Sequence, residues 1–219
     1  MPARGRPGVV FAAAPLAPTA RLNSRLAQLE QPFVVAADGG ARTALDFGLR
    51  PDVVIGDLDS LAAATLVELK RASVPIETYP RDKDATDGQL AVERALAEHP
   101  SRLLLLGFLG GPRLDQLLAN VLALSRVETP AVLLDEYNEC VLLRPDNEHV
   151  WHPEPGELIS LVPIGGAARG VRTRGLRWAL DGDRLAFGDT RGVSNEAVAE
   201  EACVTIDGGL LLVMRHFPA

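Results

Sequence analysis

Up to Leu134 the chain alternates short apolar runs with segments whose apolar residues recur at helical spacing. The runs expected to form strands are Val9–Ala13, Phe33–Ala37, Val53–Ile55, Leu103–Leu106 and Val132–Leu134. Because each run is continuous rather than alternating, it is typical of a parallel strand buried on both faces. The segments expected to form helices are Leu61–Ala72, Asp87–Glu98 and Leu114–Ser125. This alternation predicts a doubly wound, mainly parallel α/β domain over residues 1–137.

Proline and glycine punctuate the rest of the chain, over residues 138–219, where the pattern favours strands rather than helices. The β-prone pieces are Leu158–Val162, Val171–Thr173, Ala202–Ile206 and Leu210–Met214. Asp181-Gly182 and Asp207-Gly208-Gly209 have the residues of hairpin tips. Short strands between regular turn signals are typical of a small all-β sandwich or barrel, and we expect the sandwich.

The composition narrows the classes of partner. Of 219 residues, 22 are Lys or Arg and 29 are Asp or Glu, which gives a net charge of −7. A protein that binds nucleic acid without reading its sequence, or that docks on an anionic membrane, needs a basic face instead. Two cysteines are too few for a disulfide framework. No apolar run is long enough to span a membrane, and Arg4–Ala20 is better interpreted as a strand and a loop than as a signal peptide. We therefore expect a cytoplasmic protein.

Several common catalytic motifs are missing from the sequence. It contains no Walker A motif, no GxGxxG and no HExxH, and its four histidines are scattered. Any chemistry must therefore come from carboxylates and arginine.

Acidic segments, three of which contain glycine, follow the predicted strands or precede a predicted helix. They are Asp38-Gly39-Gly40, Gly56–Ser60, Lys83–Asp87 and Gly107–Asp115. In a doubly wound sheet ligands bind at the carboxyl ends of the strands, so these segments would bring their aspartates into one crevice. The aspartates are Asp38, Asp57, Asp59, Asp84, Asp87 and Asp115. Such crowding needs a metal ion or a cationic ligand to compensate the charge.

Mg²⁺ is the natural compensating ion because it binds carboxylate, water and phosphate oxygens. Asp57 and Asp59 are separated by one residue and can project to the same side of an extended loop. Neighbouring glycines allow backbone N–H groups to approach a phosphate closely, while Lys83 and Arg113 supply cations for its oxygens. The residues therefore predict a nucleotide-phosphate site that acts by positioning and charge neutralisation.

The order and spacing of these segments resemble the thiamine pyrophosphokinase family. The resemblance continues in the second region, where Gly175–Leu180 and Arg191–Glu196 are similar to the family's thiamine-side segments. It implies an enzyme in which the hydroxyl of thiamine attacks the β-phosphorus of ATP, so that thiamine diphosphate and AMP form. It also implies a homodimer with thiamine between the subunits, and in each chain an α/β domain for ATP and Mg²⁺ followed by a β-sandwich domain for thiamine.

The same resemblance implies a role for each motif residue. Asp57, Asp59 and Asp84 would bind Mg²⁺. The expected catalytic residues are Asp38, which would border the reacting hydroxyl, Asp59, Asp84 and Arg113. The expected ATP-binding residues are Gly39, Gly56, Asp57, Ser60, Lys83, Thr86, Asp87, Gly110, Gly111, Arg113 and Asp115. Trp178 would stack on the thiamine pyrimidine, with Ser194 and Asn195 forming hydrogen bonds nearby, although a core tryptophan and a turn explain these residues equally well.

The sequence departs from the family pattern in two segments. Pro112 is inserted before Arg113 and Gln116 stands in place of a histidine, and the first strand is followed by Ala14-Pro15-Leu16-Ala17-Pro18 rather than by a loop with glycine and an acidic residue. Two other functions stay open. A phosphatase of the haloacid-dehalogenase type would use Asp57 as nucleophile and Asp59 as general acid, but its later paired-acid motif is missing. A non-catalytic sensor of nucleotide or thiamine on the same fold would be expected to lose carboxylates, whereas all the motif aspartates remain.

Overall fold

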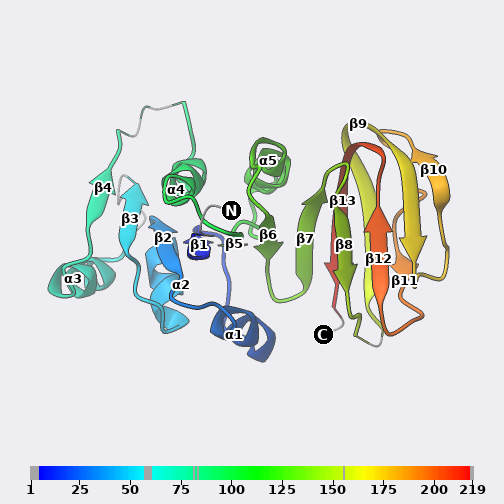
Figure 1. Ribbon diagram of the computed structural model, residues 1–219. Coiled ribbons are helices and arrows are strands. Elements are labelled where there is room, and N and C mark those ends of the chain that lie inside the picture. The colour runs from blue at the N-terminus through cyan, green and yellow to red at the C-terminus, as the bar shows by residue number, and fades with distance from the viewer. Residues whose placement is uncertain (1–4, 57–60, 81, 83, 155, 218–219) are drawn as a thin grey trace. The chain divides into compact units, whose positions relative to one another are not determined.

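The computed structural model describes residues 5–56, 61–80, 82, 84–154 and 156–217. The chain divides into two compact units, one ending at Glu136 and the other beginning at Tyr137 (Figure 1). The first unit combines helices with parallel strands, and the described part of the second is built from strands. The predicted succession of an α/β region and a β region is therefore confirmed.

A parallel sheet forms the centre of the first unit. Its strands are β1 (Gly8–Phe11), β2 (Phe33–Ala37), β3 (Val53–Gly56), β4 (Ile76–Thr78), β5 (Leu103–Leu106) and β6 (Ala131–Leu134). Neighbours pair in parallel in the order β4-β3-β2-β1-β5-β6. Every residue of β1, β2, β3 and β5 is buried, which explains their continuous apolar sequences. The chain steps outward from β1 to β4 and returns to β5 beside β1, so the strand order reverses between β1 and β5.

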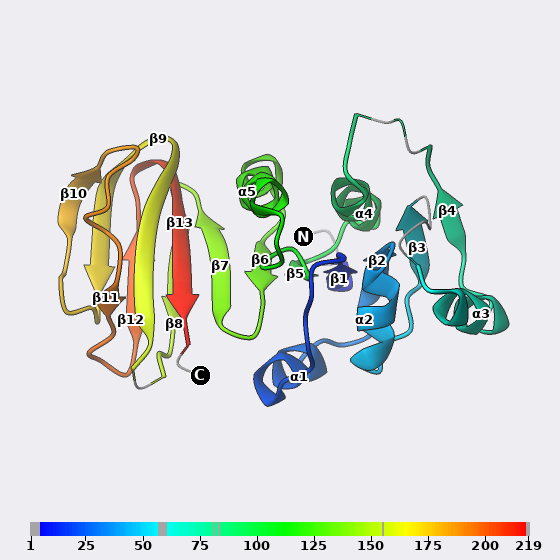
Figure 2. The ribbon, with the colours of Figure 1, turned by 180° about the vertical axis from the view of Figure 1, so that it is seen from behind.

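Helices cover both faces of this sheet. They are α1 (Ala20–Ala27), α2 (Gly40–Asp46), α3 (Ala63–Arg71), α4 (Asp87–Leu96) and α5 (Leu114–Ala123), followed by the 3-10 turn η1 (Leu124–Arg126). Figures 1 and 2 show α4 and α5 on one face and α1, α2 and α3 on the other. Threonine hydroxyls cap α1 and α4: Thr19 accepts from Leu22 N at 3.2 Å and Thr86 from Gln89 N at 3.1 Å. These bonds satisfy first-turn N–H groups that have no partner within the helix.

The predicted bounds hold best for strands buried on both faces. β2 and β5 have the predicted bounds, and α4 ends at Leu96 rather than at Glu98. The prediction lacks α1, α2 and β4. Strand β4 is short and only half-buried or exposed, so no apolar run marks it. Helix α2 begins at Gly40, a residue that favours a turn in sequence; here it permits close packing, because a Cβ on Gly40 would lie 2.3 Å from Phe11 O.

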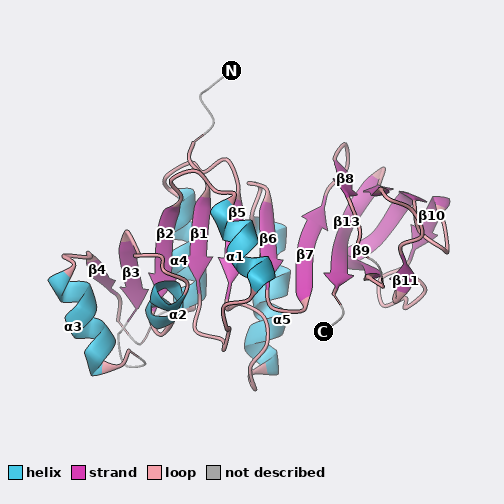
Figure 3. Ribbon diagram, turned by 90° about the horizontal axis from the view of Figure 1, so that it is seen from below, coloured by secondary structure: helices cyan, strands magenta, loops and turns pink. Residues whose placement is uncertain are grey.

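One long strand organises the second unit. Its strands are β7 (Asn138–Leu143), β8 (Glu148–Trp151), β9 (Leu158–Arg174), β10 (Asp181–Leu185), β11 (Asn195–Glu196), β12 (Ala202–Thr205) and β13 (Gly208–His216). The first part of β9 pairs antiparallel with β11 and β13, and its last part pairs with β10 and β12. In addition, β7 pairs with β13 (Figure 3), and β8 pairs with β12 (Figure 1). Strand β9 therefore belongs to two groups of strands.

Two details of the β-region prediction are wrong. The pieces expected at Leu158–Val162 and Val171–Thr173 are parts of the single strand β9. The glycines between them predicted a break, but the strand continues there with a shift in its pairing register to β13. The expected hairpin tip at Asp181-Gly182 is a bulge within β10, where Gly182 has a φ of 81°. The turn at Asp207 joins β12 to β13, and in the described pairing β9 lies between these strands, so it is not a hairpin tip either.

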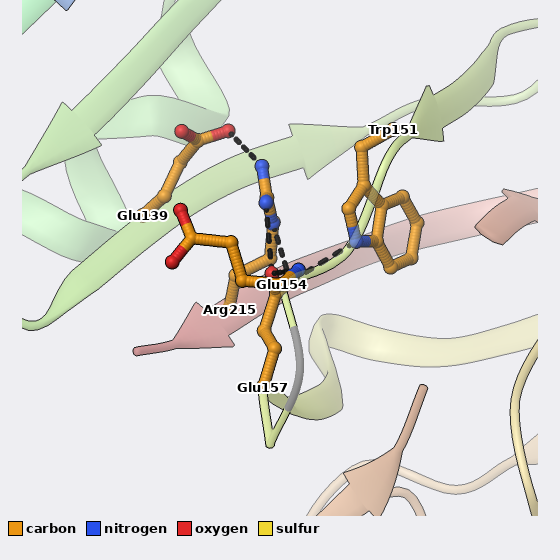
Figure 4. A network of polar contacts seen from close by, with 5 residues as sticks. All are labelled: Glu139, Trp151, Glu154, Glu157 and Arg215. Atoms are coloured by element: carbon orange, nitrogen blue, oxygen red, sulfur yellow. Dashed lines mark hydrogen bonds and ion pairs between the residues drawn. The ribbon is translucent and has the colours of Figure 1, made fainter. Parts of the chain in front are cut away.

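A buried ionic network links three strands and a loop of the second unit (Figure 4). The Arg215 guanidinium donates through Nε and Nη2 to the two carboxylate oxygens of Glu157, at 2.6 and 2.9 Å, and through Nη1 to Glu139 at 3.2 Å. Glu157 also accepts from Trp151 Nε1 and from Glu154 N, each at 3.0 Å. Buried charges persist when they are paired in this way.

Candidate active site

A pocket of about 470 Å³ lies at the carboxyl ends of β1, β2 and β5. Its walls come from the segment after β1, the end of β2, the start of α4 and the loop between β5 and α5. The predicted site residues that line it are Asp38, Thr86, Asp87, Gly110, Gly111 and Arg113. The strand order reverses at this point, and ligands bind at such a point in open parallel sheets.

Asp38 is held at this pocket by its backbone and by a neighbouring glycine. It follows β2 with a positive φ of 44°, its N–H donates to Ile55 O at 2.9 Å, and the residue is 8% exposed. A Cβ on Gly56, at the end of β3, would lie 1.8 Å from Asp38 Oδ1. Gly56 therefore leaves the space that the Asp38 carboxylate occupies, which accounts for a glycine at this strand end.

The start of α4 forms a second wall. Thr86 caps the helix, and Asp87 and Gly88 follow in its first turn. A Cβ on Gly88 would lie 3.2 Å from the Phe108 ring, so the glycine lets the helix approach the loop after β5. First-turn N–H groups of a helix favour anions, so this wall suits a phosphate.

Arg113 lines the pocket and is tied to Asp115. Its Nε and Nη2 donate to the two carboxylate oxygens of Asp115 at 2.9 and 2.5 Å, while both side chains stay largely exposed. This hydrogen-bonded guanidinium lowers the pKa of Asp115 to about 2, and the carboxylate raises the pKa of Arg113. Asp115 itself does not line the pocket, so in this structure it contacts Arg113 rather than the cavity.

The predicted metal ligands are only partly described. Asp57 and Asp59 lie outside the described residues, as do Ser60 and Lys83, so these four assignments stay predictions. Asp84 is exposed and does not line the pocket. Within the described part of the chain, no three His, Cys, Asp or Glu side chains gather as a metal-binding group. Gly39, also expected to bind ATP, occupies the N-cap position of α2 directly after Asp38.

A separate pocket of about 290 Å³ lies in the second unit. Its lining comprises the three residues that were expected to bind thiamine, Trp178, Ser194 and Asn195, together with Arg191 and Val193. Trp178 is 55% exposed, and so the tryptophan is not the core anchor that composition alone allows.

Sequence reasoning missed part of each pocket. The first pocket is also lined by Ala12–Pro15, Phe108 and Asn120, whose Nδ2 donates to Phe108 O at 2.8 Å. The family pattern predicts a loop with glycine and an acidic residue after the first strand, but Ala14–Pro18 carries neither, so no binding residue is predicted there. In the second pocket Arg191 stands three residues before Ser194 and was noted only as part of its segment.

An α/β unit with a polar pocket where its strand order reverses, joined to a β unit with an aromatic pocket, defines a two-part protein of the α/β-plus-β class. Family models match both parts: residues 26–133 match the catalytic domain of thiamin pyrophosphokinase, and residues 145–211 match its vitamin B1 binding domain. The chain belongs to the thiamine pyrophosphokinase family, enzymes that make thiamine diphosphate.

Individual relatives agree with this family. Thiamine pyrophosphokinase of Bacillus subtilis is 27% identical over 189 residues, which cover 85% of this chain and 88% of that protein. Thiamine pyrophosphokinase 2 of Arabidopsis thaliana is 30% identical over 202 residues, 81% of this chain and 75% of that protein. The crystal structure of the Geobacillus thermodenitrificans enzyme matches with a TM-score of 0.83 at 25% identity, covering 97% of this chain and 98% of that one. No helix among the described residues is long and apolar enough to cross a membrane.

Proposed function

We propose that the pocket of the first unit binds the phosphates of ATP and that the chain transfers the pyrophosphoryl group of ATP to the hydroxyl of thiamine, releasing AMP. The observation that carries the proposal is the gathering of Asp38, Thr86, Asp87 and Arg113 around one pocket where the strand order reverses. In this proposal residues 1–137 are a doubly wound ATP- and Mg²⁺-binding domain, and residues 138–219 are a β-sandwich that binds thiamine at Trp178.

The described residues would act mainly by positioning. The hydroxyl oxygen of thiamine forms a bond to the β-phosphorus and gives up its proton to solvent. The bond from that phosphorus to the α–β bridging oxygen breaks, so that the electron pair leaves with AMP. Arg113 presents a planar fork of N–H donors that suits phosphate oxygens, and the first turn of α4 presents backbone N–H groups. Asp38, fixed beside Gly56, would orient the attacking hydroxyl by accepting its hydrogen bond.

Mg²⁺ fits the donors at this pocket, because Asp38 and Asp87 contribute carboxylates to its lining. When bound, Mg²⁺ supplies positive charge that stabilises the phosphate oxygens during transfer. We propose Asp57, Asp59 and Asp84 as its ligands, on the sequence motifs alone. The homodimer with thiamine between subunits, the cytoplasmic location and the lack of nucleic-acid or membrane partners likewise stay predictions.

The test is incubation of the purified protein with ATP, Mg²⁺ and thiamine. We expect AMP and thiamine diphosphate to appear in equal amounts. Release of inorganic phosphate without thiamine would instead favour a phosphatase, and binding without turnover a sensor. In the Asp59→Asn variant turnover should be lost while the melting temperature is retained, because the site loses a metal ligand and a repelling charge together. Near-normal turnover in that variant would contradict the metal assignment.

A further inference from the structure

The side-chain amide of Asn195 lies at the Trp178 pocket but is bonded to the main chain of Trp178. Its Oδ1 accepts from Trp178 N at 3.0 Å and from Glu196 N at 2.9 Å, and its Nδ2 donates to Trp178 O at 2.8 Å. The partners fix the orientation of the amide, because N–H groups face one end and a carbonyl faces the other. Asn195 is 6% exposed, and these bonds are made in a partly buried setting.

This arrangement uses most of the hydrogen-bonding capacity of the amide. An amide oxygen accepts two hydrogen bonds and an amide nitrogen donates two. Both acceptor positions of Asn195 are taken by backbone N–H groups, and one of its two hydrogens is taken by Trp178 O. Asn195 therefore cannot accept a hydrogen bond from a ligand unless it releases a backbone group, which burial makes costly.

Trp178 depends on such support because its ring is not packed in a core. The residue lies between β9 and β10 and is 55% exposed. The Arg177 guanidinium stands 5.2 Å from the centre of the indole and donates to Glu196 Oε2 at 2.7 Å. The segment carrying the ring is thus held from the Asn195–Glu196 strand, by main-chain and side-chain bonds together.

We propose that Asn195 is a positioning residue, which fixes the main chain of Trp178 so that the indole is set for the thiamine ring, and that it does not itself accept a hydrogen bond from thiamine. This inference rests on the proposed binding of thiamine at Trp178. Direct polar contact with the substrate in this pocket then falls to the other lining side chains, Ser194 and Arg191. Asn195 acts on affinity only through Trp178, and this makes the two residues energetically coupled.

A double-mutant cycle tests the coupling. Asn195→Asp keeps the acceptor oxygens but loses the donor to Trp178 O. We expect Asn195→Asp and Trp178→Ala each to raise the KM for thiamine about tenfold with kcat nearly unchanged, and the double variant to stay within about twofold of Trp178→Ala. Effects that multiply in the double variant would overturn the proposal, since they would show an independent contact between Asn195 and thiamine.

The matched control is Thr173→Val, which removes another buried side-chain acceptor from the same unit. Thr173 is 7% exposed, and its Oγ1 accepts from Leu180 N at 2.8 Å without lining the pocket. This variant loosens the end of the same segment without touching the N–H or C=O of Trp178. Its KM should stay near that of the unaltered protein, and a rise equal to that of Asn195→Asp would overturn the proposal.

A spectroscopic measurement separates positioning from catalysis. The chain has two tryptophans, so fluorotryptophan labelling should give two ¹⁹F resonances, assigned with Trp178→Phe. In the ligand-free protein Asn195→Asp should shift or broaden the Trp178 resonance and leave the Trp151 resonance in place. An unmoved Trp178 resonance would refute the positioning role. Because this measurement needs no turnover, it tests the positioning role even if the unaltered protein makes no thiamine diphosphate. Absence of thiamine diphosphate formation would refute only the proposed function.

Discussion

Replacing Arg215 with methionine should strongly destabilise the second unit. The residue is 8% exposed, and its guanidinium faces two carboxylates, Glu157 at 1% exposure and Glu139 at 4%. Removal of the guanidinium would take from both buried carboxylates the cation with which they pair. The contacts of the guanidinium with the Trp151 and Phe217 rings, 5.7 and 5.1 Å from their centres, would be lost as well.

The size of the effect follows from the chemistry of the carboxylates left behind. A glutamate in water has a pKa of about 4.3, so keeping one protonated at pH 7 costs about 4 kcal/mol. Removal of one partner from a buried ion pair costs about 3–5 kcal/mol, and we expect Arg215→Met to lower the free energy of unfolding by that amount. Glu139→Gln should cost only about 1 kcal/mol, because it leaves Arg215 balanced by the doubly bonded Glu157.

Urea unfolding followed by tryptophan fluorescence measures this difference. Both tryptophans, Trp151 and Trp178, belong to the second unit, so their emission reports that unit. The control is Arg172→Met, which removes the same charge from an exposed ion pair and should leave the midpoint nearly unchanged. If Arg215→Met and Arg172→Met unfold at the same urea concentration, the reasoning is wrong. Should Arg215→Met not fold at all, Glu139→Gln provides the test. Its midpoint should lie at a lower urea concentration than that of Arg172→Met, and an equal or higher midpoint would contradict the reasoning.

Smaller changes test the strand-end packing and the titrating groups. Gly56→Ala should lower kcat at least about tenfold, because a Cβ would lie 1.8 Å from the Asp38 carboxylate. Gly48 also has a positive φ but has open space around it, so Gly48→Ala should retain kcat. Equal kcat values in the two variants would contradict this account. Asp115 should titrate with a pKa of about 2 by NMR, so the stabilisation from its ion pair is complete above the ordinary aspartate pKa and is lost as the pH falls toward 2. Arg113→Ala should return the pKa of Asp115 to its ordinary range. An unchanged titration midpoint of Asp115 in that variant would refute the pairing. Burial raises the pKa of the Cys140 thiol from 9.0 to about 12, so a thiol reagent should label Cys140 only after unfolding. The free energy of unfolding should fall as the pH rises from 9 toward 12, because the unfolded chain loses the thiol proton first. Rapid labelling of Cys140 in the folded protein would count against this prediction.

Strands buried on both faces could be predicted from the sequence because a continuous apolar run of strand length leaves few alternatives. Phe33–Ala37 and Leu103–Leu106 are such runs. Strands that are short and polar could not be predicted, as β4, β10 and β11 show. Their conformation depends on pairing with β3 or β9, and no local pattern records a partner that lies elsewhere in the chain.

Part of the first pocket could be predicted by a single rule, that parallel strands end at the same edge of a sheet. Asp38, Asp87 and Arg113 come from three segments and line one pocket for this reason. The rule was applied to charged residues at strand ends, and so it did not select Ala12–Pro15, which line the same pocket. It also selected Asp84, which is exposed and lies outside the pocket lining, because position after a strand or before a helix does not determine where a side chain points.

A motif does not distinguish a residue that touches the ligand from one that holds such a residue in place, since both must keep the same spacing. Asp115 and Asn195 were both assigned to ligands on their motifs, and each is bonded to a neighbour that lines a pocket, Arg113 or Trp178. Counting hydrogen-bond capacity separates the two cases. A carboxylate offers about four acceptor sites, so Asp115 can hold Arg113 and still serve a cation. The amide oxygen of Asn195 has only two, and both are used, so Asn195 can accept a ligand hydrogen bond only by releasing the N–H of Trp178 or of Glu196.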